Sequence, residues 1–202
     1  MKELSIEIVS PRLRAILGDV AFVLVGSLVV AAAAQIVIPV WLVPMTLQTL
    51  AVLSVGATLG SRLGSMSLIL YGFEGAIGLP FFAGGKSGIF DQKLDYLFPS
   101  GSMGYVAGFV LAAWLVGRIV ETGRPRSLFR SILATGTGAL VLYVPGLTWL
   151  TIWAHTAQHL DLSASVTSAL QWGFYPFVVG DSLKALIAGL SCAALPSMIK
   201  PK

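Results

Sequence analysis

The chain has 202 residues, of which 56% are hydrophobic and 11% are charged, whereas a soluble domain is roughly 25% charged. This composition excludes an ordinary soluble domain and predicts an integral membrane protein. The net charge of +4 does not indicate nucleic-acid binding, because the basic residues are scattered between apolar segments and form no basic face. A single cysteine, Cys192, excludes an internal disulfide and a thiolate metal site.

Six apolar segments follow one another along the chain, and a transmembrane helix needs about 20 such residues. They predict an all-α membrane protein, a compact bundle that forms a single domain over residues 1–202, with spans at 20–40, 46–60, 63–79, 104–120, 131–153 and 174–199. The second segment is short, so we expect it to be shallow or tilted. The first is too long for a signal-peptide core, and no cleavage is expected.

The lysines and arginines predict the orientation of the bundle. With the N-terminus in the cytoplasm, ten of the lysines and arginines lie on the inner side and only Lys86 and Lys93 lie on the outer side. This distribution satisfies the positive-inside rule. Both termini are therefore expected in the cytoplasm, and a ligand pocket is expected at the outer side.

A long outer loop, residues 80–103, has the composition of a lid over a ligand. It is glycine-rich and nearly neutral, and it carries aromatic residues that include Phe81 and Phe82. Its Gly85-Lys86-Ser87 sequence is not a nucleotide-binding loop, because Pro80 replaces the glycine that such a loop requires five positions earlier. The alternative interpretation is an ordinary flexible loop.

Asp181 and Lys184 are the charged residues of the last apolar segment before Lys200. Three residues apart on a helix, they share a face and can form an ion pair at membrane depth. The alternative is a structural pair that ties this helix to a neighbour. Intramembrane ionisable residues are usually functional, so the pair predicts contact with a small polar ligand.

Two further polar residues lie in apolar surroundings. Thr46 is a candidate N-cap of the second helix, and the buried amide of Gln48 needs hydrogen-bond partners. Gln48 is expected either in the pocket or in a hydrogen bond between helices. Glu74 could face the pocket, reach the headgroups or pair with Lys86, and no role is assigned to it.

No catalytic or metal motif is recognisable in the sequence, and no cofactor is expected. His155 and His159 have the spacing of zinc ligands, but Thr156 stands where the general-base glutamate of a zinc protease motif would be.

The stretch between residues 155 and 172 is expected to contain an interfacial helix. Small residues on the first helix, which include Ser27 and Ala31, suit either docking of another subunit or internal packing.

Four motifs in this order resemble the BioY family, the biotin-specific substrate-binding components of energy-coupling factor transporters. They are Pro44–Thr49, Gly75–Gly84, Gly104–Phe109 and Gly180–Lys184. The resemblance implies a six-helix protein of the bacterial cell (inner) membrane that captures biotin from the outside. It also implies partners, namely a transmembrane coupling subunit and cytoplasmic ATPases. The chain itself would be no enzyme, since the partner subunits hydrolyse ATP.

The resemblance also implies roles for individual residues. Asp181 and Lys184 match the pair that contacts the ligand in the family, and Gly84 matches a ligand-side position. Small residues of the first helix would dock on the coupling subunit, namely Ser27, Ala31 and Ala34. We expect the polar groups of biotin to meet Asp181, Lys184 and Gln48 or Thr46, and its apolar part to lie among Phe81, Phe82, Tyr105 and Tyr175.

Three alternatives stay open on the sequence. The ligand could be another vitamin, for instance thiamine or riboflavin. The chain could instead be a proton-coupled carrier that uses Asp181 as its proton site. An intramembrane enzyme acting on lipid, with Asp181 and Lys184 as acid and base, is disfavoured because no nucleophile or metal cluster accompanies them.

Overall fold

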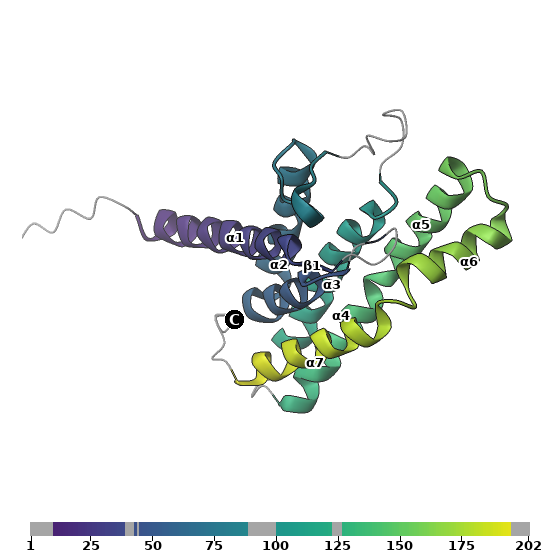
Figure 1. Cartoon of the computed structure of the whole chain (residues 1–202). Helices are drawn as coiled ribbons and strands as arrows, with labels where there is room; N and C mark the ends of the chain where they lie inside the picture. Colours follow the sequence, from purple (N-terminus) through teal and green to yellow (C-terminus); the bar gives the residue numbers. More distant parts are fainter. Residues whose placement is uncertain (1–9, 39–42, 44, 89–99, 123–126, 195–202) are drawn as a thin grey trace, which may run out of the picture.

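The computed structural model describes residues 10–38, 43, 45–88, 100–122 and 127–194. The protein is mostly helical, as predicted, and its helices gather into a bundle (Figure 1). The elements are α1 (Pro11–Gln35), β1 (Val37–Ile38), β2 (Met45–Thr46), α2 (Gln48–Ala76), the 3-10 helix η1 (Ala83–Gly85), α3 (Met103–Glu121), α4 (Leu128–Val141), α5 (Tyr143–Ala157), α6 (Leu162–Gly173) and α7 (Val178–Ala194). The strands β1 and β2 form an antiparallel pair.

Helix α2 is folded back on itself at Gly60, whose φ of 83° is left-handed. A β-carbon on Gly64 would lie 3.1 Å from the Cα atom of Gly56, and the side chains of Gln48 and Tyr71 are hydrogen-bonded although they are 23 residues apart. A straight helix would separate those two residues by about 35 Å. The arms 48–59 and 61–76 are therefore antiparallel, and they correspond to the second and third predicted segments.

The turn of this helical hairpin is held by α3. The carboxylate of Glu121 accepts hydrogen bonds from the backbone nitrogen of Ser61 at 2.7 Å and from its hydroxyl at 2.9 Å. Glu121 thus caps the start of the second arm from another helix. Gly117 lies against the same turn, where a β-carbon would collide with the backbone of Gly60 and Ser61.

Two predicted spans differ from the helices found. The segment predicted as one helix over 131–153 consists of α4 and α5, which meet at Leu142 and together cover Leu128–Ala157. The last helix begins at Val178, because residues 174–177 form a turn that bends α6 and α7 by 50°. The predicted residues 195–199 lie outside the described part of the chain. Helix α6 occupies the stretch predicted as an interfacial helix.

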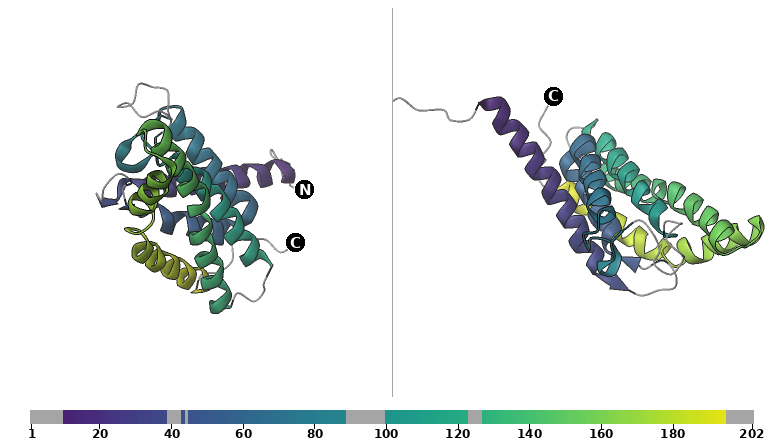
Figure 2. Two further views of the ribbon diagram at one scale, coloured as in Figure 1. Left: turned by 90° about the vertical axis from the view of Figure 1, so that its right-hand side faces the viewer. Right: turned by 90° about the horizontal axis from the view of Figure 1, so that it is seen from above.

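Among the described residues, four helical segments are long and apolar enough to cross a membrane, or up to five if α6 and α7 form one bent span. One of the four is α2, whose length is counted along both arms of its hairpin. Large apolar side chains also lie on the outside of the bundle, as lipid contact requires, for example Leu17, Val25 and Leu186. Figure 2 shows α1 crossing one side of the bundle, while α5 and α6 extend together at the opposite end.

The small residues of α1 face the bundle interior. Ser27, Ala31 and Ala34 are buried, and the Ser27 hydroxyl donates a hydrogen bond to the Glu74 carboxylate on α2. Their burial is consistent with packing inside the bundle, and docking of these three residues on another subunit stays a prediction. Glu74 has a structural role that the sequence did not assign.

Acidification is expected to loosen the start of α6. Asp161 caps this helix, and the backbone N–H of Ala164, followed by the hydroxyl of Ser163, lowers the pKa of Asp161. A lowered folded-state pKa gives stability that is complete above the unfolded value of about 3.9 and is lost as the pH falls through the folded value. Hydrogen exchange at the Ala164 amide should therefore accelerate below about pH 4 relative to Asp161→Asn, which retains a neutral cap. Equal pH profiles would contradict this assignment.

Candidate functional site

Asp181 and Lys184 form a buried ion pair on α7, as their spacing predicts. The Lys184 Nζ atom lies 2.9 Å from Asp181 Oδ1, and the exposed fractions of the two residues are 9% and 5%. The Tyr143 hydroxyl, at the start of α5, donates to Asp181 Oδ2 at 2.6 Å. Both oxygens of the buried carboxylate thus have a hydrogen-bond partner, as burial of a polar group requires.

A second polar cluster surrounds Gln48 at the start of α2. The Gln48 side chain donates to the Tyr71 hydroxyl at 2.7 Å and accepts from the Thr46 hydroxyl at 2.9 Å. Thr46 lies in β2 and Leu47 occupies the N-cap position, so the predicted N-cap is displaced by one residue. The Thr46 hydroxyl still accepts the backbone N–H of Gln48 at 3.2 Å. The helix–helix alternative for Gln48 is realised, because Tyr71 belongs to the other arm of α2.

The two clusters belong to one region of the bundle. A β-carbon on Gly180, next to Asp181, would lie 3.3 Å from the sulfur of Met45, the neighbour of Thr46. Helices α2 and α7 are also in contact. The motifs that begin near residue 44 and residue 180 therefore converge, although 135 or so positions separate them in the sequence. Pro44 itself lies outside the described residues.

The beginning of the predicted lid is attached to α1 and α2. The Gln35 side chain donates to the carbonyl of Phe82 at 3.4 Å, and the Phe82 ring meets the Tyr71 ring edge-on with centroids 5.7 Å apart. Phe82 packs directly on Gly75, where any β-carbon would collide with it. Phe81 is half-buried against the core. Residues 89–99 of the predicted lid lie outside the described part of the chain.

Gly84 has a conformation that explains its lack of a side chain. Its φ of 67° is left-handed, which glycine adopts without strain. It is exposed, and a β-carbon there would be 3.9 Å from Val37 of β1. Gly84 is thus near the strand pair that carries Thr46, but no contact with the Asp181 pair is observed among the described residues.

Aromatic side chains surround the ion pair. Tyr105 is buried, and its hydroxyl donates a hydrogen bond to the carbonyl of Gly173 at 2.8 Å. Its ring packs edge-on against the ring of Tyr143, with the centroids 6.2 Å apart. The ring of Phe174 also packs edge-on against Tyr143, with the two ring centroids 5.1 Å apart. Tyr175 is 62% exposed and its ring packs edge-on against Phe174, so its place in the pocket wall stays a prediction. The turn between α6 and α7 points Phe174 inward instead.

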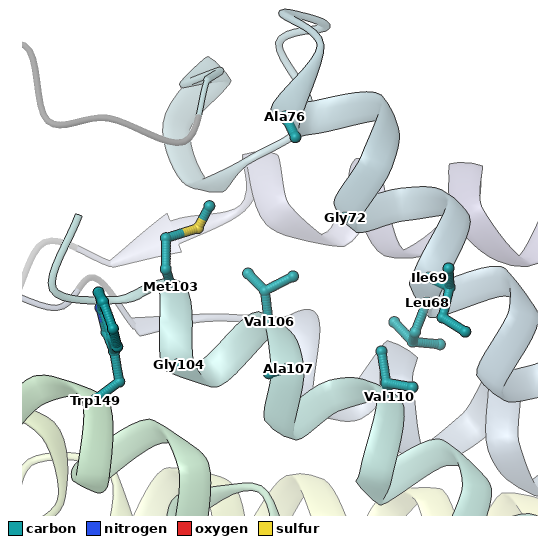
Figure 3. A pocket seen from close by; sticks show the side chains of 10 residues that line it. All are labelled: Leu68, Ile69, Gly72, Ala76, Met103, Gly104, Val106, Ala107, Val110 and Trp149. Atoms are coloured by element: carbon teal, nitrogen blue, oxygen red, sulfur yellow. The ribbon is translucent and has the colours of Figure 1, made fainter. Parts of the chain in front are cut away.

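An apolar groove of about 480 Å³ lies elsewhere, between α2, α3 and α5 (Figure 3). None of the predicted biotin-binding residues lines it. Within the described residues, no group of three or more potential metal ligands occurs. The Nδ1 atom of His155 is 2.7 Å from the carbonyl oxygen of Leu160.

Two residues of the site were missed in the sequence. Tyr143 and Tyr71 hold the functional groups of Asp181 and Gln48, respectively. A usable signal existed, because a tyrosine within an apolar helix needs a partner for its hydroxyl. The sequence could not pair either tyrosine with its partner, since 38 and 23 residues separate them.

A mostly helical chain with several apolar spans, which buries an acid–base pair and an amide cluster between its helices, has the features of a membrane protein that binds a small polar ligand. The BioY family model matches residues 4–200. The chain belongs to the BioY family, as the four sequence motifs predicted.

Curated relatives and a solved structure agree with this family. The chain is 32% identical over 182 residues to the biotin transporter BioY2 of Lactococcus lactis subsp. cremoris, covering 89% of this chain and 90% of that protein. It is 33% identical over 166 residues to the biotin transporter BioY of Thermotoga maritima, covering 82% and 88%. Its fold is similar to the S-component for biotin from an ECF-type ABC transporter, with a TM-score of 0.67, 21% identity and coverage of 90% and 92%.

Proposed function

We propose that this chain binds biotin and serves as the substrate-specific S-component of an energy-coupling factor transporter. The observation that carries the proposal is the buried Asp181–Lys184–Tyr143 group beside the Gln48 cluster, in a chain of the BioY family. Neither another vitamin nor a proton-coupled carrier is favoured, because the curated relatives are biotin transporters.

The free hydrogen-bonding capacity of the site suits the polar groups of biotin. Lys184 has three N–H donors, and among the described residues it gives one of them to Asp181. Gln48 gives one of its two amide hydrogens to Tyr71. The Asp181 carboxylate accepts one hydrogen bond at each oxygen and retains further lone pairs. Lys184 and Gln48 can donate to a carbonyl or carboxylate, while Asp181 can accept a ureido N–H.

The aromatic residues around these groups suit the apolar part of biotin. Tyr105 and Phe82 adjoin the two polar clusters, and Phe81 lies at the start of the lid. Phe174 takes the place that the sequence suggested for Tyr175. Gly84 contributes backbone alone. We assign these residues to the wall that faces the ring sulfur and the aliphatic tail.

The remaining properties follow from this assignment. Six passes are obtained if α1, the two arms of α2, α3, the α4–α5 pair and the α6–α7 pair each cross the membrane once. Both termini would then be cytoplasmic and the pocket would open outward, in the inner membrane of a bacterial cell. A coupling subunit and ATPases would supply the energy, and the chain itself would catalyse no reaction.

Titration calorimetry of the purified protein against biotin, thiamine and riboflavin tests the proposed ligand. We expect a saturable heat with biotin and none with the other two vitamins. Tight binding of a different vitamin would overturn the assignment of biotin, but the chain would still be a substrate-binding S-component. Uptake that survives ATP depletion and collapses with the proton gradient would instead support the carrier.

Tyr143→Phe should weaken biotin binding through the position of Asp181. The hydroxyl donates to this carboxylate at 2.6 Å, and a hydrogen bond to a charged group contributes about 1.5–3 kcal/mol. Part of that energy stabilises the unliganded protein, so we expect a loss of about tenfold in affinity. Tyr175→Phe, which removes a hydroxyl from an exposed ring, is the matched control. Equal affinities for both variants would remove Tyr143 from the site.

A further inference from the structure

The apolar groove is a separate feature of the bundle, between the second arm of α2 and the first half of α3. In Figure 3, Gly72 and Ala76 lie on one side of it and Val106 and Ala107 on the other, with Trp149 of α5 beyond the end of α3. Its volume of about 480 Å³ is within the range of small-molecule pockets, about 300–1,000 Å³. The groove is therefore large enough for a ligand.

Small residues create the groove, and its walls are fixed by packing. A β-carbon at Gly72 would lie 3.2 Å from a methyl group of Val106, so the two helices approach closely there. At the α5 end, Trp149 packs directly against Gly104, and its indole nitrogen donates to the carbonyl of Ser100 at 3.0 Å. The ring is thus locked in place.

The lining excludes a polar ligand. Its side chains are aliphatic, methionine or tryptophan, apart from the two glycines, and the tryptophan N–H is already bonded to Ser100. A vitamin with several donors and acceptors would lose its hydrogen bonds to water here without replacement. A hydrocarbon chain makes no hydrogen bonds to water and so loses none on entering the groove.

The position of the groove identifies the occupant. Helix α3 is long and apolar enough to cross a membrane, and so is α2 when its length is counted along both arms of the hairpin. Ile69 and Ala107 are exposed at the groove, and the same helix faces continue into the exposed side chains of Met66 and Leu111. The groove is therefore continuous with the apolar surface that contacts lipid. We propose that it holds one acyl chain of a membrane phospholipid, which lies lengthwise between the two helices.

Photocrosslinking in nanodiscs tests this assignment. The full chain is reconstituted with phosphatidylcholine that carries a diazirine in one acyl chain, and the adducts are mapped by mass spectrometry. We expect adducts concentrated on residues 68–76 and 103–110. Ala107→Phe fills the groove from an exposed position and should remove the excess of adducts on these two segments. Leu190→Phe, at an exposed position of α7, should leave the excess unchanged. Biotin binding of Ala107→Phe should equal that of the parent, since Ala107 lies outside the proposed biotin site.

Three outcomes would overturn the proposal. The first is an even distribution of adducts over all exposed apolar helix faces, and the second is an unchanged pattern in Ala107→Phe. The third is a dimer of the full chain in the nanodisc that protects residues 68–76 and 103–110 from the adducts, which would make a second copy of the chain the occupant. If Ala107→Phe fails to fold, Ala76→Phe fills the other end of the groove and must give the same loss.

Discussion

Replacing Lys184 by methionine should weaken biotin binding at least tenfold. The ammonium group is buried, and its charged hydrogen bonds to a ligand each contribute about 1.5–3 kcal/mol, where 1.4 kcal/mol corresponds to a factor of ten. Methionine keeps the length and the packing of the side chain but provides no donor. Titration calorimetry measures the affinity, and Lys86→Met, at an exposed lysine of the loop, is the matched control.

The stability of the same variants separates the ligand role from the ion-pair role. Lys184→Met leaves the buried Asp181 without its cation, and breaking a buried pair on one side costs about 3–5 kcal/mol. The double variant Asp181→Asn/Lys184→Met removes both charges and should recover much of the unfolding temperature without recovering biotin binding. Recovery of both properties would show that the pair serves the fold alone, as the structural alternative supposes.

The second large effect is expected at the turn of the α2 hairpin. Gly117→Ala places a methyl group against the backbone of Gly60 and Ser61, which cannot move without opening the hairpin. Overpacking of this kind costs about 1–3 kcal/mol, so the thermal unfolding temperature in detergent should fall by several degrees. The displaced turn would also lose the Glu121 cap.

Gly136→Ala on α4 is the matched control for this substitution. A β-carbon at Gly136 meets nothing within 4 Å, and alanine is favoured over glycine in a helix by about 1 kcal/mol. We therefore expect an unchanged or slightly raised unfolding temperature. If Gly117→Ala and Gly136→Ala unfold at the same temperature, the close contact between α3 and the hairpin turn is wrong.

The sequence predicted the helical class and the ion pair because both depend on local spacing. Asp181 and Lys184 had to share a face once α7 was a helix, and the break after Gly60 followed from polar residues next to short apolar segments. The family could be predicted as well, since its motifs are short and contiguous. These features need no knowledge of which helices touch.

The partners of these residues required the three-dimensional arrangement. Tyr143 reaches Asp181 only because α5 begins beside α7, and Glu74 reaches Ser27 only because α1 lies on the second arm of α2. Periodicity along α1 showed a smooth small-residue surface but not which helix covers it. The exposure of Tyr175 could not be predicted for a similar reason, because the turn between α6 and α7 decides which ring points inward.

A structure of the chain with biotin bound tests the central claim most directly. We predict that polar atoms of biotin lie within hydrogen-bonding distance, about 2.7–3.2 Å, of both Asp181 and Lys184, with Tyr143 still bonded to the carboxylate. Biotin bound elsewhere, with the Asp181–Lys184 pair still buried and in contact, would contradict the account.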